Sequence, residues 1–182
     1  MTERKTYHST LGDLLLEAEN RTLTMCKWSD TTIHDNEGCV SSCSKGGFLD
    51  IVSSGLDEYL AGKRKTFDIP LADRGTPFDN IVWNLIASIP YGDTMSYSQI
   101  ARMTGRPGGA RAVANACRRN PLCIFVPCHR VIAADGSLSG YSGGRERKKS
   151  FCNLRNSQTN SNVISEKICN FASSYGFFFI IM

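Results

Sequence analysis

The chain has 182 residues, of which 41% are hydrophobic and 21% are charged, and its formal net charge is +4 at pH 7. This length and composition allow one domain, or two small packed domains, with a real core, and they exclude a chain that is mainly disordered. The mildly positive charge is compatible with a polyanionic partner, although many proteins that bind none share it.

The first third of the chain predicts a short sheet followed by a helix. Residues 14–25 indicate a β-hairpin, because apolar and polar residues alternate on both sides of a turn at 20–21. Residues 29–47 are rich in Ser, Thr, Gly and Asp without a period, which indicates a loop. Helical spacing follows at 48–60, and we expect a short strand at 66–71.

A long helix is predicted to open the second part of the chain. Thr76 can cap its N-terminus, Pro77 suits the first helical position, and Asp79 favours the positive end of the helix dipole. Apolar residues within 78–89 then fall on one face of this helix. Residues 90–92 contain a proline and a glycine, which end it.

Two short helices joined by a turn come next. Ser96 and Gln99 have the spacing of a capping box, which predicts a helix at 97–103. Residues 105–109 contain three glycines and a proline and force a turn, after which a further helix is predicted at 110–120. This pair of helices has the pattern of a helix-turn-helix.

One face of the second helix is suited to the surface of a nucleic acid. Arg111, Asn115 and Arg118 fall on the same side as the small Ala114. Small side chains would let the helix backbone approach DNA closely while Arg111 reaches into it. A solvated amphipathic helix is an equally good interpretation of this segment taken alone, because such faces are usual on surface helices.

A cysteine in a reactive context follows this helix. Apolar residues 124–126 lead into Pro127-Cys128-His129-Arg130. A free thiol has a pKa of about 8.5, so an attacking cysteine needs a base or positive surroundings, which His129 and Arg130 can supply. Adjacent residues seldom point the same way, so we expect a water to bridge Cys128 and His129. A Cys-His pair in isolation is more often a buried structural thiol beside an ordinary histidine.

Taken in order, the motifs of the chain resemble those of the O6-alkylguanine-DNA alkyltransferases. The resemblance is strong over residues 75–149, weaker in the hairpin and over 55–71, and absent beyond. The motifs that carry it are Gly75-Thr76-Pro77-Phe78, Ile89-Pro90-Tyr91-Gly92, Ser96-Tyr97, Ala110-Arg111-Ala112-Val113, Asn120-Pro121, Pro127-Cys128-His129-Arg130-Val131 and Gly140-Tyr141-Ser142-Gly143-Gly144.

The predicted elements and the resemblance together indicate an α+β fold. We expect a small N-terminal α/β domain with a short sheet at 1–72, a mainly helical domain with the helix-turn-helix at 73–150, and a divergent C-terminal tail at 151–182. The resemblance implies a single-turnover DNA repair protein that moves an alkyl group from O6 of guanine to its own cysteine. It also implies no cofactor, no metal, a monomer, and a partner that is double-stranded DNA bound through the minor groove.

The resemblance implies a role for each residue of the reacting site. Cys128 corresponds to the alkyl acceptor, and His129 to the base that deprotonates it through a water. Asn120 corresponds to the asparagine that ties the two helices to the active-site loop. Tyr97 would crowd the phosphate of the target nucleotide, help to rotate the nucleotide out, and donate a proton to the departing guanine.

Further residues correspond to DNA contacts and to the guanine pocket. Arg111 would fill the place that the flipped base leaves in the stack. The Val131 carbonyl would accept a hydrogen bond from the exocyclic amine of guanine. Candidates for contacts to the DNA backbone, which hold the duplex without reading its sequence, are Ser98, Arg106 and Arg118. The remaining candidates for the pocket wall are Tyr141, Ser142 and Gly143.

Three other interpretations are compatible with parts of the sequence. A relative that binds the lesion without transferring the alkyl group would lack the cysteine, which this chain has. A cysteine hydrolase using Cys128 and His129 would turn over a thioester, but no oxyanion site is evident in the sequence. A zinc site is conceivable, although its spacing fits no strong template; its ligands would be Cys26, His34, Cys39 and Cys43.

The C-terminal segment departs from the family pattern. The resemblance expects two leucines and then a glutamate that holds the histidine, and these fall on Phe151, Cys152 and Arg155. Arg155 cannot accept a hydrogen bond from His129. Unless Glu166 substitutes for the missing glutamate, we therefore expect a protein that binds DNA, transfers slowly and has a loosely packed tail.

The ends of the chain give no sign of export or membrane insertion. Residues 1–5 are polar and lead into no apolar segment, so we expect a protein of the cytoplasm or nucleus that is not secreted. The apolar run at 177–182 is far shorter than the roughly 20 residues of a membrane-spanning helix. In a reducing compartment the eight cysteines should be mostly free thiols.

Overall fold

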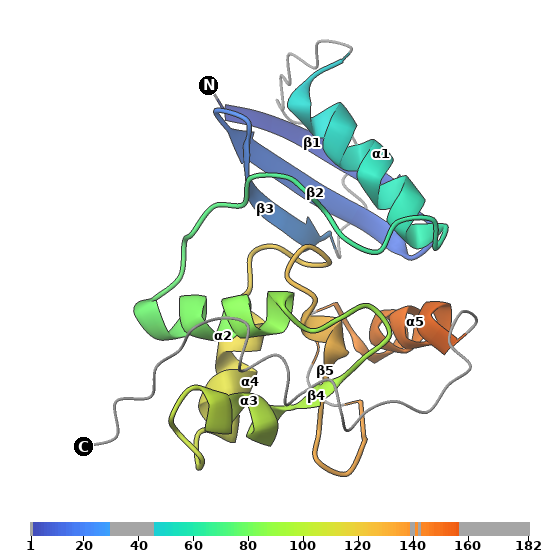
Figure 1. Cartoon of the computed structure of the whole chain (residues 1–182). Helices are drawn as coiled ribbons and strands as arrows, with labels where there is room; N and C mark the ends of the chain where they lie inside the picture. The colour runs from blue at the N-terminus through green and yellow to red at the C-terminus, as the bar shows by residue number, and fades with distance from the viewer. Residues whose placement is uncertain (1, 30–45, 139–140, 142, 157–182) are drawn as a thin grey trace.

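The computed structural model describes residues 2–29, 46–138, 141 and 143–156, with only the backbone described for 153–156. A three-stranded sheet with one helix packed along it lies beside a group of short helices (Figure 1). The α+β architecture is therefore the one expected from the sequence, with a strand-rich part preceding a helical part.

The N-terminal part is an antiparallel sheet in the order β1-β2-β3, covered by α1. Leu14 and Leu16 are fully buried because their side of β2 faces the core, which confirms the predicted hairpin. The sequence did not predict β1, a mostly polar strand in which Tyr7 alone is buried. The bounds of these elements are Thr2–Ser9 for β1, Gly12–Glu19 for β2, Thr22–Trp28 for β3 and Phe48–Leu60 for α1.

The strand expected at 66–71 is wrong. Leu71 forms a single parallel bridge with Leu23, in which the Leu23 amide donates to the Pro70 carbonyl and the Ala72 amide donates to the Leu23 carbonyl, both at 2.9 Å. Pro70 has no amide hydrogen to extend the ladder. This segment is therefore an extended connection that runs beside the first residues of β3.

The helical part begins with two helix starts that the sequence predicted. Side chains of Thr76 and Asp79 form a reciprocal capping box at α2, and those of Ser96 and Gln99 form another at α3. The predicted helix-turn-helix pair is α3 and α4. The elements are α2 at Pro77–Ala87, β4 at Met95–Ser96, α3 at Tyr97–Met103, α4 at Ala110–Arg119, the 3-10 turn η1 at Cys128–Arg130, β5 at Val131–Ile132 and α5 at Arg145–Asn156.

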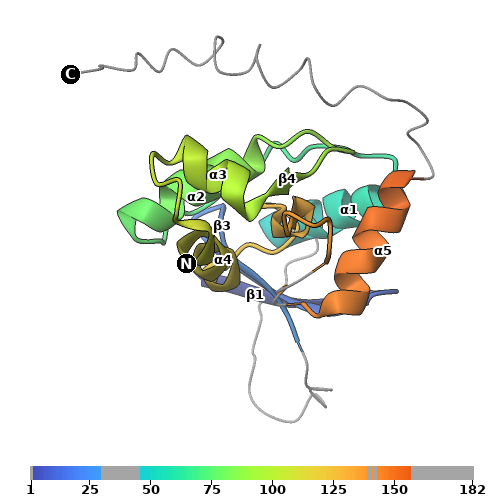
Figure 2. The same ribbon diagram turned by 90° about the horizontal axis from the view of Figure 1, so that it is seen from below.

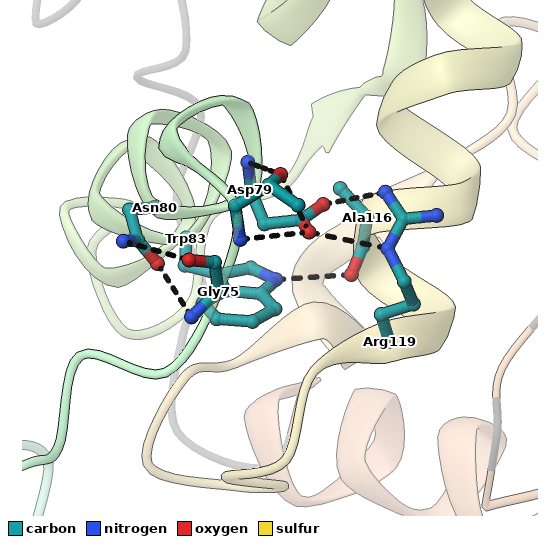
Figure 3. Close-up of polar contacts among 7 residues, drawn as sticks. Gly75, Asp79, Asn80, Trp83, Ala116 and Arg119 are labelled. Atoms are coloured by element: carbon teal, nitrogen blue, oxygen red, sulfur yellow. Dashed lines mark hydrogen bonds and ion pairs between the residues drawn. The ribbon is translucent and has the colours of Figure 1, made fainter.

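Helix α4 is fixed to α2 by a polar clamp (Figure 3). The buried carboxylate of Asp79 accepts two hydrogen bonds from the Arg119 guanidinium, at 2.6 and 3.2 Å, while it also caps α2 through Thr76. The indole nitrogen of Trp83 donates to the Ala116 carbonyl at 2.9 Å. Since both contacts reach the last two turns of α4, they set the direction in which this helix presents its outer face.

The two parts of the fold share one hydrophobic core and meet at β3. The loop after α4 continues the sheet locally, because the Cys26 amide donates to the Pro121 carbonyl and the Cys123 amide donates to the Cys26 carbonyl, both at 2.8 Å. Helix α5 lies at the opposite side of the molecule from α2, α3 and α4 (Figure 2). Its Arg147 donates to the Leu11 carbonyl at 2.8 Å, and the guanidinium lies 4.5 Å above the Trp28 ring.

Candidate active site

Cys128 opens the η1 turn and is almost fully buried, with 5% of its surface exposed. The side-chain amide of Asn120 donates to its Sγ at 3.1 Å and to the Val126 carbonyl at 3.0 Å. The Asn120 oxygen accepts from the Leu122 amide at 2.9 Å. Asn120 therefore joins the end of α4, the following loop and the cysteine in one network.

The surroundings of Cys128 favour the neutral thiol. A hydrogen bond with Cys117, burial, and the proximity of the Cys117 and Cys123 thiols raise its pKa well above the ordinary value, and the hydrogen bond from Asn120 opposes this only in part. The resting residue is therefore protonated at neutral pH. Any nucleophilic role requires that a proton be removed when the substrate is in place.

Lys148 is a buried cation that the sequence analysis missed. Its side chain on α5 is fully buried, its ammonium donates to the Val131 carbonyl at 2.7 Å, and Nζ lies 5.9 Å from the centre of the Tyr97 ring. Burial lowers its pKa, while the nearby thiols of Cys117 and Cys128 work in the opposite direction. A positive charge beside these thiols favours a thiolate once it forms.

The Val131 carbonyl, predicted to accept from guanine, already accepts from Lys148. A carbonyl oxygen has two lone pairs, so one is left for a second donor. The β4–β5 pairing fixes this carbonyl in place, with Met95 opposite Val131. The predicted acceptor therefore lies on a paired segment of backbone three residues after Cys128.

Tyr97 is the first residue of α3 and is mostly buried beside the cysteines. Burial raises its pKa to about 12, and the neighbouring Cys117 and Cys128 add to the shift, against a smaller opposite effect of Arg118. The phenol therefore keeps its proton at neutral pH. This neutral phenol lies next to Cys128.

His129 and Arg130 are also buried, and they point toward other elements. Nε2 of His129 lies 3.2 Å from the Tyr59 hydroxyl, and its ring stacks on Phe151 with centroids 4.5 Å apart. Arg130 donates to the Ile89 carbonyl and to the Tyr59 hydroxyl. The suggested role of Arg130 as a positive charge beside the cysteine stays a prediction, because its hydrogen bonds go to other groups, while the fold brings Lys148 close to the Cys128 thiol.

The outer face of α4 carries the predicted DNA contacts. Arg111 and Arg118 are exposed on this face, whereas Val113 and Ala116 on the opposite side are fully buried. Ser98 is half-buried in the first turn of α3. The exposed Arg106 has its guanidinium 4.9 Å above the Phe78 ring, so its side chain also packs on α2.

The structure describes only part of the predicted pocket wall. The Tyr141 hydroxyl accepts from the Trp28 indole nitrogen at 3.4 Å, and burial raises the Tyr141 pKa well above its ordinary value. A Cβ atom at Gly143 would overlap both aromatic side chains, so this position admits no side chain. Ser142 lies outside the described residues.

Comparison with known proteins follows the same division of the chain. The pattern of the 6-O-methylguanine DNA methyltransferase ribonuclease-like domain matches residues 4–72, and that of the family's DNA-binding domain matches 77–155. The methylated-DNA--protein-cysteine methyltransferase of Mycobacterium leprae is 42% identical over 159 residues, which are 87% of this chain and 94% of the relative.

The chain belongs to the 6-O-methylguanine DNA methyltransferase family.

Solved structures of the family have the same fold. The O6-methylguanine methyltransferase of Mycobacterium tuberculosis is 39% identical, with a TM-score of 0.76 over 89% of this chain and 97% of that one. The structure of Mycobacterium tuberculosis OGT in complex with DNA gives 39% identity and a TM-score of 0.76 over 87% of this chain and 96% of that one.

The family match extends further toward the C-terminus than the sequence motifs indicated. It reaches residue 155, and α5 continues without a break from Arg145 to Asn156. Phe151, at the first expected leucine, is buried against the His129 ring, and Cys152 is half-buried. The side chain of Arg155 and the whole of Glu166 lie outside the described residues.

Several other predicted features of this methyltransferase chain also fall outside the residues that the structure describes. His34, Cys39 and Cys43 of the conceivable zinc site lie outside the described residues, while Cys26 is buried in β3. The tail at 157–182 is outside them as well. Within the described part of the chain, none of the helices is both long and apolar enough to cross a membrane.

Proposed function

We propose that this protein repairs alkylated DNA by transferring a methyl or larger alkyl group from O6 of guanine to Cys128, irreversibly and once per molecule. The observation that carries the proposal is the Asn120 amide, which donates to Sγ of Cys128 from the end of α4. The helix suited to DNA and the nucleophile thus belong to one rigid unit. Relatives named methylated-DNA--protein-cysteine methyltransferases, and a family structure in complex with DNA, support the same reaction.

The transfer forms a bond between sulfur and the alkyl carbon and breaks the bond from that carbon to O6. His129 takes the thiol proton through a water, which is necessary because the pKa of Cys128 is raised. The Lys148 ammonium stabilises the thiolate in the interval before attack. Guanine leaves as an anion, and Tyr97, whose pKa is about 12, donates a hydrogen bond or proton to it.

The product explains why each molecule would act once. A thioether sulfur has no proton to lose and is a poor leaving group, so the alkylated Cys128 cannot pass the group onward. The reaction requires no cofactor, because the substrate itself supplies the activated carbon. The same chemistry separates this function from hydrolysis, in which a thioester intermediate would be released by water.

The DNA would bind across α3 and α4. The small side chains beside Arg111 suit the minor groove, and Arg111 would occupy the stack after the base leaves it. Ser98, Arg106 and Arg118 would contact phosphates. The flipped guanine would lie against the pocket wall, with its exocyclic amine on the second lone pair of the Val131 carbonyl; the other residues of this wall would be Tyr141, Ser142 and Gly143.

Intact mass after incubation with a duplex bearing O6-methylguanine tests the proposal. We expect the gain of one methyl group, located on Cys128 by peptide mapping and lost in Cys128→Ala. Cys152→Ala, which removes a half-buried thiol of α5, is the matched control and should still accept the group. Binding of the lesion without any gain of mass would indicate the non-transferring alternative, and multiple turnovers would exclude a suicidal reaction.

A further inference from the structure

The active-site histidine is contacted by a residue of the N-terminal part. Tyr59 lies in the last turn of α1, and its hydroxyl is 3.2 Å from Nε2 of His129. Both side chains are almost fully buried, since 3% of Tyr59 and 4% of His129 are exposed. The contact therefore joins residues 70 positions apart, one from each part of the fold.

The His129 ring is also held by two aromatic rings. Phe151 stacks on its face at 4.5 Å, with 23° between the planes. The ring of Tyr59 meets it nearly edge-on at 6.5 Å and 65°. Tilting the imidazole out of its plane would disrupt both contacts, so the two rings fix the plane of the imidazole, and the tyrosine hydroxyl lies opposite Nε2.

Arg130 fixes the Tyr59 hydroxyl in turn. Its Nη2 donates to that hydroxyl at 3.3 Å, while Nη1 donates to the Ile89 carbonyl at 2.5 Å and the guanidinium lies 5.6 Å above the Tyr91 ring. A guanidinium only donates, so it occupies one lone pair of the phenol oxygen and leaves the other for a second donor. Burial raises the pKa of Tyr59, and the phenol therefore stays neutral.

We infer that Tyr59 is the positioning residue of His129: it accepts a hydrogen bond from Nε2–H and thereby selects the tautomer whose lone pair is on Nδ1. The inference rests on the proposed role of His129 as the base for Cys128. With Nε2 engaged by the phenol, the thiol proton is taken at Nδ1. The imidazolium formed in that step keeps its Nε2–H donated to Tyr59.

The size of the effect follows from the chemistry of the acceptor. A neutral hydroxyl stabilises an imidazolium less than a carboxylate does, and the nearby charge of Arg130 opposes a second positive charge. Tyr91 is a further titratable group beside the contact, with its ring 5.9 Å from that of Tyr59. We therefore expect loss of the hydroxyl to slow transfer by about tenfold, as is typical when the partner of a reacting group is removed.

The test compares Tyr59→Phe with Tyr91→Phe in the full-length chain. Tyr91 is a matched control because its ring packs edge-on against Tyr59 at 5.9 Å, and it also loses only a hydroxyl. The measurement is the single-turnover rate with free O6-benzylguanine across pH. In Tyr59→Phe the imidazolium loses its acceptor and its charged form becomes less stable, so the rate should fall about tenfold and the midpoint of the rise in rate with pH should move to lower pH.

A second readout is independent of alkyl transfer. The ¹⁵N chemical shifts of His129 report which ring nitrogen carries the proton, and Tyr59→Phe should redistribute the two tautomers whereas Tyr91→Phe should not. Equal tautomer populations in wild type and Tyr59→Phe, or the same rate and pH midpoint in both variants, would overturn the inference. If wild type adds no alkyl group to Cys128 then the proposed function fails, and the nitrogen shifts still decide the role of Tyr59.

Discussion

Arg111→Ala separates the reaction of duplex DNA from the chemistry at the cysteine. Arg111 is exposed near the start of α4, on the face opposite the buried side of the helix. Its removal should change the free energy of unfolding by no more than about 0.5 kcal/mol, as for other surface positions. Any large effect on transfer from duplex DNA must then come from the lost contact of Arg111 with the DNA and not from a loss of stability.

The magnitude follows from the energy of base flipping. Extruding a base takes a few kcal/mol, and a side chain that refills the stack offsets part of it. If Arg111 supplies about 2–3 kcal/mol of this, the variant should react about 30- to 150-fold more slowly with duplex O6-methylguanine. Free O6-benzylguanine has no stack to refill, so its rate should stay within about twofold of wild type.

The assay is single-turnover transfer with saturating duplex and, separately, with free O6-benzylguanine. Arg118→Ala is the matched control, because it removes an exposed arginine from the last turn of the same helix. It should weaken DNA binding and reduce the salt dependence by a slope of about 0.9 for one phosphate contact, with little change in the saturated rate. Equal losses on duplex and free base in Arg111→Ala would refute the reasoning and assign Arg111 a structural role.

Two further predictions concern stability and the C-terminal helix. Asp79 has a lowered pKa, chiefly through its hydrogen bond to Arg119, so its charged form stabilises the fold at pH values above the unfolded value of about 3.9; in urea titrations Asp79→Asn should be less stable than wild type there, and the gap should close as pH falls through the lowered pKa. A gap that stays constant from pH 7 to pH 2 would show that the charge is not responsible. Replacing residues 150–182 with a helix that restores two leucines and the glutamate expected at Arg155 should raise the single-turnover rate, and an unchanged rate would mean that the departure from the family pattern is no defect.

Local signals in the sequence were sufficient for most elements. The capping pair Thr76 and Asp79, and the pair Ser96 and Gln99, fixed two helix starts because a cap involves residues only three positions apart. The hairpin and α1 followed from periodicity. The prediction of a strand at 66–71 was wrong, because strand pairing depends on which distant segment of backbone lies beside it and because Pro70 interrupts the ladder.

In the candidate site, too, some features follow from local sequence and others only from the tertiary structure. The sequence alone was enough to predict Cys128 as the acceptor, since its motif and its spacing from the helix-turn-helix are properties of neighbouring residues. The tertiary structure decided which groups surround it. Cys117 lies against its thiol, Lys148 donates to the Val131 carbonyl, and the Tyr59 hydroxyl contacts His129. A pKa, a tautomer and the partner of a buried charge depend on which distant segments exclude water from the same place, and no periodicity within one segment carries that information.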